Sequence, residues 1–294
     1  MPPYYNEFRK YLSQELKCSS NTKAAYLKDI SDLAAFASAI FMRELPELNQ
    51  DDLQNYLNTV VESGKSSSTV RRISSALKCY YSFLLFNHVL SESPAHSFIL
   101  PKSERRSPSF LTTDEVDQLL RQPKFSDPKG FRDKAMLELL YATGIHVSEL
   151  IALNIADVNL KASCIRCMKG ENSRIIPIYP AAVNSLSYYM KSIRPKFLQK
   201  KDENALFLNM NGSRMTRQGF WKILKFYADE AHISKDISPN TLRHSFAMHL
   251  IQNGADNKFI QDILGYKDIS STEFYSRMFR QNIQNKYMKF HPKA

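Results

Sequence analysis

An arginine and a tyrosine near the C-terminal end of the sequence are the residues best suited to chemistry. Arg243 lies early in a run of helical periodicity, and its planar guanidinium can bind two oxygens of one phosphate group at once. Tyr275 and the pair Gly265-Tyr266 follow it along the chain. If the fold brings these residues together, an arginine able to hold a phosphate group lies beside a tyrosine hydroxyl.

Three short helices are expected to bring these residues within reach of one another. Ser238 and Pro239 are types favoured at the N-cap and the first residue of a helix. Gly254 marks the end of this helix, and a second helix begins at Asp256 and ends at Gly265. A third helix, capped by one of the serines at 270 and 271, carries the tyrosine. The apolar residues recur at helical spacing in the first two runs: Leu242, Phe246, Leu250 and Ile251, then Phe259, Ile260, Ile263 and Leu264.

Four segments of this region resemble the signature of the tyrosine recombinases, the phage-integrase and Xer family. They read T-L-R-H-S-F-A, N-G-A-D, I-Q-D-I-L-G and D-I-S-S-T-E-F-Y, and they match nearly in register over about forty residues. The resemblance implies an enzyme that breaks and rejoins DNA without a metal ion or cofactor. In that family a tyrosine attacks a backbone phosphate and forms a covalent 3′-phosphotyrosine link, which a 5′-hydroxyl group of a partner strand then attacks.

The resemblance assigns catalytic roles to three residues of this chain. Tyr275 matches the nucleophile, and Arg243 matches the second of two arginines that stabilise the charge of the phosphorane transition state. Lys169, in the run M-K-G-E-N-S-R, matches the lysine that protonates the leaving 5′-oxygen.

Three further catalytic positions of the family carry other residues here. His146 stands in T-G-I-H-V-S-E-L where the family has its first arginine, and Asn240 and Tyr266 stand where it has histidines. Each change removes a cation or a proton-transfer group. Loss of one donor to the transition state costs about 3–4 kcal/mol, or about 10²–10³ in rate, and loss of an acid–base group costs about 10²–10⁴. We therefore expect strand cleavage to be weakened or absent when the protein acts alone.

Two other pairs of residues are interpreted as structural. Cys164 and Cys167 form one C-x-x-C pair within an expected strand, and no second pair follows to complete a zinc site. His244 and His249 lie on the helix of Arg243 without a companion for metal binding. We expect both histidines to be structural, with support of Arg243 as the alternative role for His244.

The composition indicates a basic protein of the cytoplasm. The chain of 294 residues is 43% apolar and carries a formal charge of +11, which favours an acidic partner such as nucleic acid. Residues 1–98 carry 10 basic and 10 acidic residues, whereas residues 109–294 carry 27 and 18. A basic protein without a nucleic-acid role fits the charge alone equally well. The sequence contains no apolar run of about 18 residues, the length that would indicate a membrane span. The N-terminus lacks the pattern of a signal peptide. The four cysteines are compatible with free thiols in a reducing compartment.

Residues 1–98 are expected to form a helical bundle, because apolar residues repeat at helical spacing without strand-like alternation. The resemblance implies a SAM-like core-binding domain that clamps one side of the DNA duplex. Arg71, Arg72 and Lys78 lie on one expected helix and are candidates for phosphate contacts. An ordinary solvated helix face is the alternative. Residues 99–110 contain two prolines and are expected to form an extended linker.

Residues 111–294 are expected to form a mainly helical domain with a small antiparallel sheet. Strand-like runs over 163–168 and 174–178 predict a hairpin, and residues 205–208 are a candidate third strand. The resemblance implies a tyrosine-recombinase catalytic domain. Residues 281–290 are expected to form a last helix that docks on its own domain or, as the resemblance implies, on a neighbouring protomer.

Two functions are compatible with the sequence. The first is site-specific recombination of double-stranded DNA by a tetramer of this chain, or of this chain with a related recombinase. The second is a DNA-binding subunit or regulator that has lost strand cleavage and pairs with an active recombinase. The three retained catalytic residues favour the first function, and the three changed positions favour the second.

Overall fold

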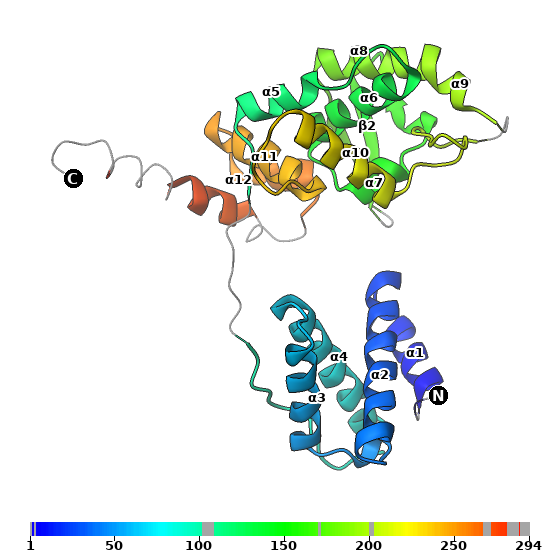
Figure 1. The fold of residues 1–294 in the computed structure, drawn as a ribbon, viewed down its shortest axis with the longest axis vertical. Helices are drawn as coiled ribbons and strands as arrows, with labels where there is room; N and C mark the ends of the chain where they lie inside the picture. Colours follow the sequence, from blue (N-terminus) through cyan, green and yellow to red (C-terminus); the bar gives the residue numbers. More distant parts are fainter. Residues whose placement is uncertain are drawn as a thin grey trace. The chain divides into compact units, whose positions relative to one another are not determined.

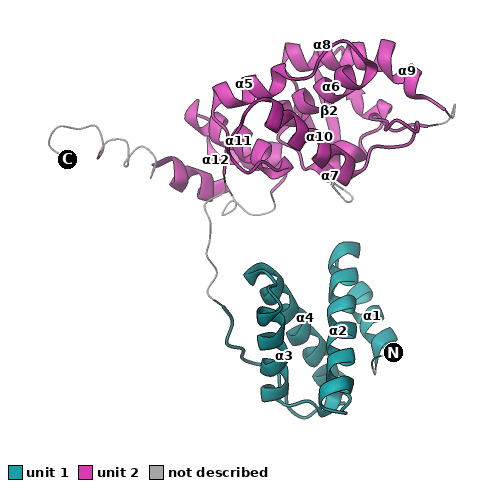
Figure 2. Cartoon of the chain, viewed as in Figure 1, with its two compact units in different colours: residues 1–106 teal, residues 107–294 magenta. Residues whose placement is uncertain are grey.

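The chain divides into two compact units, residues 1–106 and residues 107–294 (Figure 2). The computed structural model describes residues 2, 4–101, 109–169, 172–199, 203–266, 272–280 and 288, without the side chains of residues 169 and 172. Most of the expected linker and nearly all of the expected last helix, residues 281–290, lie outside this part. Within it, no helix is long and apolar enough to span a bilayer.

The described part of the first unit is a helical bundle, as the periodicity of its sequence predicts (Figure 1). Three of the helices begin after side chains that accept a backbone N–H of the first turn, namely Ser19, Asn49 and Ser66. Their apolar faces meet in one core around Phe8 and Tyr80, whose rings meet edge to face. The elements are α1 (Tyr5–Gln14), α2 (Ser20–Ile40), η1 (Leu45–Glu47), α3 (Gln50–Glu62) and α4 (Ser67–Phe86).

The described part of the second unit is mainly helical and contains a three-stranded antiparallel sheet in the order β1-β2-β3. Helix α6 lies at its centre, where it packs against α8 and α11 (Figure 1). The elements are α5 (Thr113–Arg121), α6 (Pro128–Thr143), α7 (Val147–Ala152), η2 (Ile155–Asp157), β1 (Val158–Asn159), β2 (Cys164–Lys169), β3 (Asn172–Pro177), α8 (Pro180–Tyr188), the π-turn η3 (Tyr189–Ile193), α9 (Arg194–Phe197), α10 (Arg217–Glu230), α11 (Pro239–Gln252), α12 (Asn257–Leu264) and a helix over residues 272–280.

The predicted hairpin is present as β2 and β3, with Ile165 opposite Ile176 and both side chains in the core. The expectation of a third strand at 205–208 is wrong. There Ala205 and Leu208 make isolated bridges, to Asn154 and Arg214, and the third strand of the sheet is the two-residue β1. A side chain supplies part of the hydrogen bonding here, because Arg194 donates to the carbonyl oxygens of Ala205 and Leu206. Such long-range bonds leave no periodic signal in the sequence.

Candidate active site

Helix α11 presents Arg243 to the interior. The helix begins as predicted, with Pro239 at its first position and the Ser238 side chain accepting the N–H of Thr241. One turn further on, Arg243 is only 1% exposed. Because a buried guanidinium needs hydrogen-bond acceptors around it, the fold must supply them from other segments.

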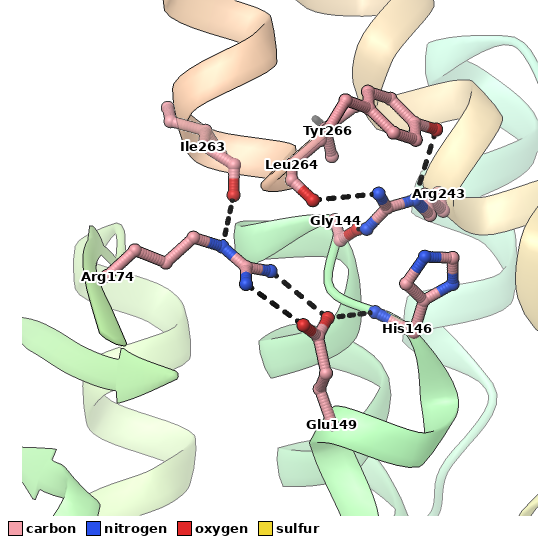
Figure 3. Close-up of polar contacts among 8 residues, drawn as sticks. All are labelled: Gly144, His146, Glu149, Arg174, Arg243, Ile263, Leu264 and Tyr266. Carbon is pink, nitrogen blue, oxygen red and sulfur yellow. Dashed lines mark hydrogen bonds and ion pairs between the residues drawn. The ribbon is translucent and has the colours of Figure 1, made fainter. Parts of the chain in front are cut away.

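Three groups from two distant segments accept the Arg243 donors (Figure 3). Nη1 donates to the Gly144 carbonyl oxygen at 2.5 Å, and Nη2 donates to the Leu264 carbonyl oxygen at 2.9 Å. Nε donates to the Tyr266 hydroxyl at 3.4 Å, and the Tyr266 ring lies over the guanidinium with its centroid 4.8 Å from Cζ. Of the five N–H groups of the guanidinium, these bonds occupy three.

A glycine at the end of α6 makes the first of these contacts possible. Gly144 has φ +58°, a left-handed conformation that residues with a side chain seldom adopt. A Cβ atom there would lie 2.3 Å from the Phe246 ring on α11. The close approach of these two helix segments therefore depends on glycine, and it points the Gly144 carbonyl at Arg243.

Tyr275 lies in the same cluster and is 2% exposed. Its hydroxyl group is 2.8 Å from His244 Nδ1 and 3.1 Å from the Tyr266 hydroxyl. Burial raises the pKa of Tyr275 well above its usual range, the hydrogen bond and charge of Tyr266 add to the rise, and Arg243 offsets part of it. The phenol is thus neutral at physiological pH and needs a base to become a nucleophile.

A second, partly buried arginine joins three segments of the site. Arg174 on β3 makes a two-pronged ion pair with Glu149 on α7, at 2.9 and 3.0 Å, and its Nε donates to the Ile263 carbonyl oxygen at 2.8 Å (Figure 3). Glu149 Oε2 also accepts the His146 backbone N–H at 2.8 Å. Burial raises the pKa of Glu149, but the Arg174 bonds and the His146 N–H outweigh it and hold the pKa below its usual value. The arginine therefore fixes the start of α7, the hairpin and the end of α12 to one another.

The predicted site residues are brought together in part. Arg243, Tyr266 and Tyr275 form one connected cluster. His146 precedes α7, and its imidazole points toward the Arg243 end of the site (Figure 3). Asn240 is exposed and lines a pocket of about 370 Å³ with Val147, the neighbour of His146.

Lys169 ends β2, where its backbone pairs with Asn172. Its side chain lies outside the described part of the structure.

The candidate DNA-binding residues of the first unit are exposed on α4, and each has a partner. Arg71 donates to the Pro101 carbonyl oxygen at 3.1 Å, and the Lys78 ammonium lies 5.7 Å from the centre of the Phe98 ring. Arg72 pairs with Asp29, a carboxylate that is 3% exposed. Arg71 and Lys78 are therefore better placed than Arg72 to exchange their present partner for a phosphate.

His249 and Cys167 make contacts that are structural. His249 is held by Tyr141 and by the Leu111 carbonyl oxygen, as expected for a structural residue. Cys167 is buried in β2, and burial raises its pKa to about 12. Among the described residues, no cluster of three or more His, Cys, Asp or Glu could hold a metal ion.

His244, by contrast, touches the Tyr275 hydroxyl, a contact that sequence reasoning did not predict. The sequence also gave no role to Glu149 or Arg174. The local signal for Glu149 is its position three residues after His146, which is the spacing of a capping box. Arg174 has no such local signal.

Comparisons with known proteins agree with this architecture. The phage integrase family model matches residues 109–282, and the model of the phage integrase N-terminal SAM-like domain matches residues 5–87. Tyrosine recombinase XerD of Staphylococcus epidermidis is 37% identical over 289 residues, and that of Oceanobacillus iheyensis is 38% identical over 291; each match covers 98% of both chains. The structure of XerH recombinase bound to a palindromic difH substrate has a TM-score of 0.73 at 20% identity, covering 96% of this chain and 83% of the other. The chain therefore belongs to the phage integrase family, the tyrosine recombinases.

Proposed function

We propose that this protein recombines double-stranded DNA at specific sites, with Tyr275 as the nucleophile and Arg243 as a residue that holds the scissile phosphate. The observation that carries the proposal is the path of contacts from Arg243 Nε through the Tyr266 hydroxyl to the Tyr275 hydroxyl, at 3.4 and 3.1 Å. A phosphate held by this arginine would therefore lie close to the tyrosine. The two retained groups thus occupy one site although different helices carry them.

The proposed reaction needs no energy source, because the phosphotyrosine link stores the energy of the broken phosphodiester. Arg243 stabilises negative charge on the non-bridging oxygens, and Lys169 protonates the leaving 5′-oxygen. His146 lacks the charged fork of an arginine, which removes about 3–4 kcal/mol of stabilisation from the transition state. We therefore expect cleavage to be slow when the protein acts alone.

Both units take part in DNA binding in this proposal. The first unit contacts the duplex through Arg71, Arg72 and Lys78 on α4, and the second carries the catalytic cluster. The related XerH structure contains a difH substrate, and another related structure is a lambda integrase dimer on a core site. Their bound DNA supports duplex DNA as the partner of this chain. The active assembly in this proposal is a tetramer on DNA, of this chain alone or with a related recombinase.

The experiment that tests the proposal has two steps. A binding site is first selected from a pool of random duplexes, and that site is then supplied with a nick that traps the cleaved intermediate. We expect a slow covalent adduct that Tyr275→Phe abolishes and that the matched Tyr266→Phe variant retains. Absence of an adduct at every pH, with the selected site bound, would contradict the proposal.

A catalytically lost DNA-binding subunit is the second candidate. It is favoured by the burial of Tyr275, which is 2% exposed with both of its hydroxyl contacts made to protein groups. It predicts sequence-specific binding without an adduct, together with faster cleavage by a related recombinase when this chain occupies the neighbouring site. A cleavage rate of the partner that does not depend on this chain would contradict it.

A further inference from the structure

His244 and Tyr266 approach the Tyr275 hydroxyl group together. His244 Nδ1 is 2.8 Å from the oxygen, and the Tyr266 hydroxyl is 3.1 Å from it. His244 comes from α11 and is adjacent in sequence to Arg243, whereas Tyr275 comes from the helix over 272–280. The imidazole is therefore already within proton-transfer distance of the atom that must lose a proton.

One arrangement of protons gives each donor in this cluster an acceptor. Arg243 Nε–H donates to the Tyr266 oxygen. The Tyr266 O–H then donates to the Tyr275 oxygen, and the Tyr275 O–H donates to His244 Nδ1. In this arrangement His244 is neutral and carries its proton on Nε2. The path runs from a fixed cation to a neutral base, so it polarises the Tyr275 O–H bond toward His244.

The environment keeps His244 in the form that accepts a proton. Burial lowers its pKa, and the neighbouring Arg243 charge lowers the pKa further. The titratable and charged groups that the described structure places beside the imidazole include the Arg243 guanidinium and the Tyr275 hydroxyl, and the Tyr266 hydroxyl contacts both of these groups. A phenol such as Tyr266 is a far weaker base than an imidazole, and Asn240 cannot accept a proton at all.

We infer that His244 takes the proton of Tyr275 when the tyrosine attacks the phosphate, an assignment that rests on the recombination proposed above. The Tyr275 O–H bond breaks and its proton moves to His244 Nδ1, while the tyrosine oxygen bonds to phosphorus. The bond from phosphorus to the 5′-oxygen breaks, and that oxygen takes a proton from Lys169. Rejoining reverses these steps, and His244 returns the proton to Tyr275. The imidazolium formed in between is partly exposed to solvent and lies next to the negatively charged phosphate.

The matched test compares two histidines of the same helix that both contact a tyrosine hydroxyl through Nδ1. His244 contacts Tyr275, and His249 contacts Tyr141, each at 2.8 Å. Asparagine keeps a hydrogen-bonding atom near the Nδ1 position but has no basic nitrogen. We expect His244→Asn to slow single-turnover adduct formation by about 10²-fold. The decrease of this rate at acidic pH should disappear in the variant, and its affinity for DNA should be unchanged. His249→Asn keeps the pH profile of the parent.

A chemical rescue separates proton transfer from structure. Replacement of Tyr275 by 3,5-difluorotyrosine, whose phenol ionises at lower pH, restores much of the rate in His244→Asn and changes the parent little. A merely structural role for His244 predicts no rescue.

Nitrogen NMR of the imidazole tests the contact in the absence of DNA, because loss of the hydroxyl in Tyr275→Phe shifts the Nδ1 resonance of His244.

The outcomes distinguish this assignment from the proposed function. If the parent forms the adduct and His244→Asn matches its rate and pH profile, the assignment alone is wrong. An unshifted Nδ1 resonance in Tyr275→Phe also overturns the assignment. If the parent forms no adduct at all, the proposed function fails, and the contact between His244 and Tyr275 is only structural.

Discussion

The ring of Tyr266 lies over the guanidinium of Arg243, with the ring centroid 4.8 Å from Cζ, and the tyrosine hydroxyl accepts a hydrogen bond from Nε at 3.4 Å (Figure 3). A cation–π contact of this kind contributes about 1–2 kcal/mol in a desolvated site. Tyr266 therefore covers one face of the Arg243 guanidinium and accepts one of its hydrogen bonds.

Restoration of the three changed positions is expected to increase cleavage. The variant combines His146→Arg, Asn240→His and Tyr266→His, which adds one guanidinium group and two imidazoles to the site. Since one fork contributes about 10²–10³ in rate, we expect a gain of at least about 10²-fold in adduct formation on a nicked substrate. The same three changes in a Tyr275→Phe background serve as the control and give no adduct. An unchanged rate would mean that more than these side chains separates the site from an active one.

Removal of Arg174 is expected to destabilise the second unit. The Arg174 and Glu149 side chains are 14% and 9% exposed, so Arg174→Met leaves a carboxylate buried without its partner. Loss of one member of such a pair costs about 3 kcal/mol. The control is Arg166→Met, because Arg166 is 56% exposed and pairs with Asp157 at 3.5 Å, and exposed pairs contribute less than about 1 kcal/mol. Urea unfolding of the two variants measures both values, and equal losses would contradict a structural role of Arg174.

The decrease of the free energy of unfolding at acidic pH should depend on Glu149. Its pKa is lowered in the folded protein from a reference value of 4.5, so its stabilising contribution is complete above about pH 4.5 and is lost as the pH falls through the folded pKa. Glu149→Gln lacks this contribution. The free energy of unfolding of the parent is therefore expected to decline more steeply than that of Glu149→Gln below about pH 4.5. Parallel profiles for the two proteins would show that Glu149 is not ion-paired in solution.

Two residues of α4 are expected to govern the salt dependence of DNA binding. Arg71→Ala and Lys78→Ala should each weaken binding uniformly across DNA sequences and reduce the salt slope by about 1. Lys28→Ala is the control, since Lys28 is an exposed lysine of α2 that pairs with Asp32. Titrations over a range of salt concentrations give the slopes. The alternative of an ordinary solvated face predicts the same slope for all three variants.

Local signals predicted the elements that carry the site. Ser238 and Pro239 begin α11, Asp256 accepts a backbone N–H at the start of α12, and Gly265 ends that helix with φ +66°. These residues act through the conformation of their own backbone and the first turn of their helix, so they can be recognised without knowledge of the fold. The convergence of Arg243, Tyr266 and Tyr275 followed from this order of elements.

The contacts that the sequence did not reveal all join distant segments. Arg174 and Glu149 belong to a strand and a helix, and no periodicity links their positions. His244 on α11 meets Tyr275 on the helix over 272–280, so their contact depends on how two separate helices pack. Residues 205–208 have the apolar types of a strand, but the Arg194 side chain donates to the carbonyl oxygens of Ala205 and Leu206. Tertiary contacts overrode the local preference there.

The identity of the tyrosine that becomes linked to DNA tests the central claim most directly. Trypsin separates the two candidates, because Tyr266 lies in the peptide 259–267 and Tyr275 lies in the peptide 268–277. Mass spectrometry of a nuclease-trimmed adduct should find the nucleotide mass on the peptide 268–277 and none on the peptide 259–267. A nucleotide on the peptide 259–267, or on neither peptide while the selected site is bound, would contradict the assignment of Tyr275 as the nucleophile.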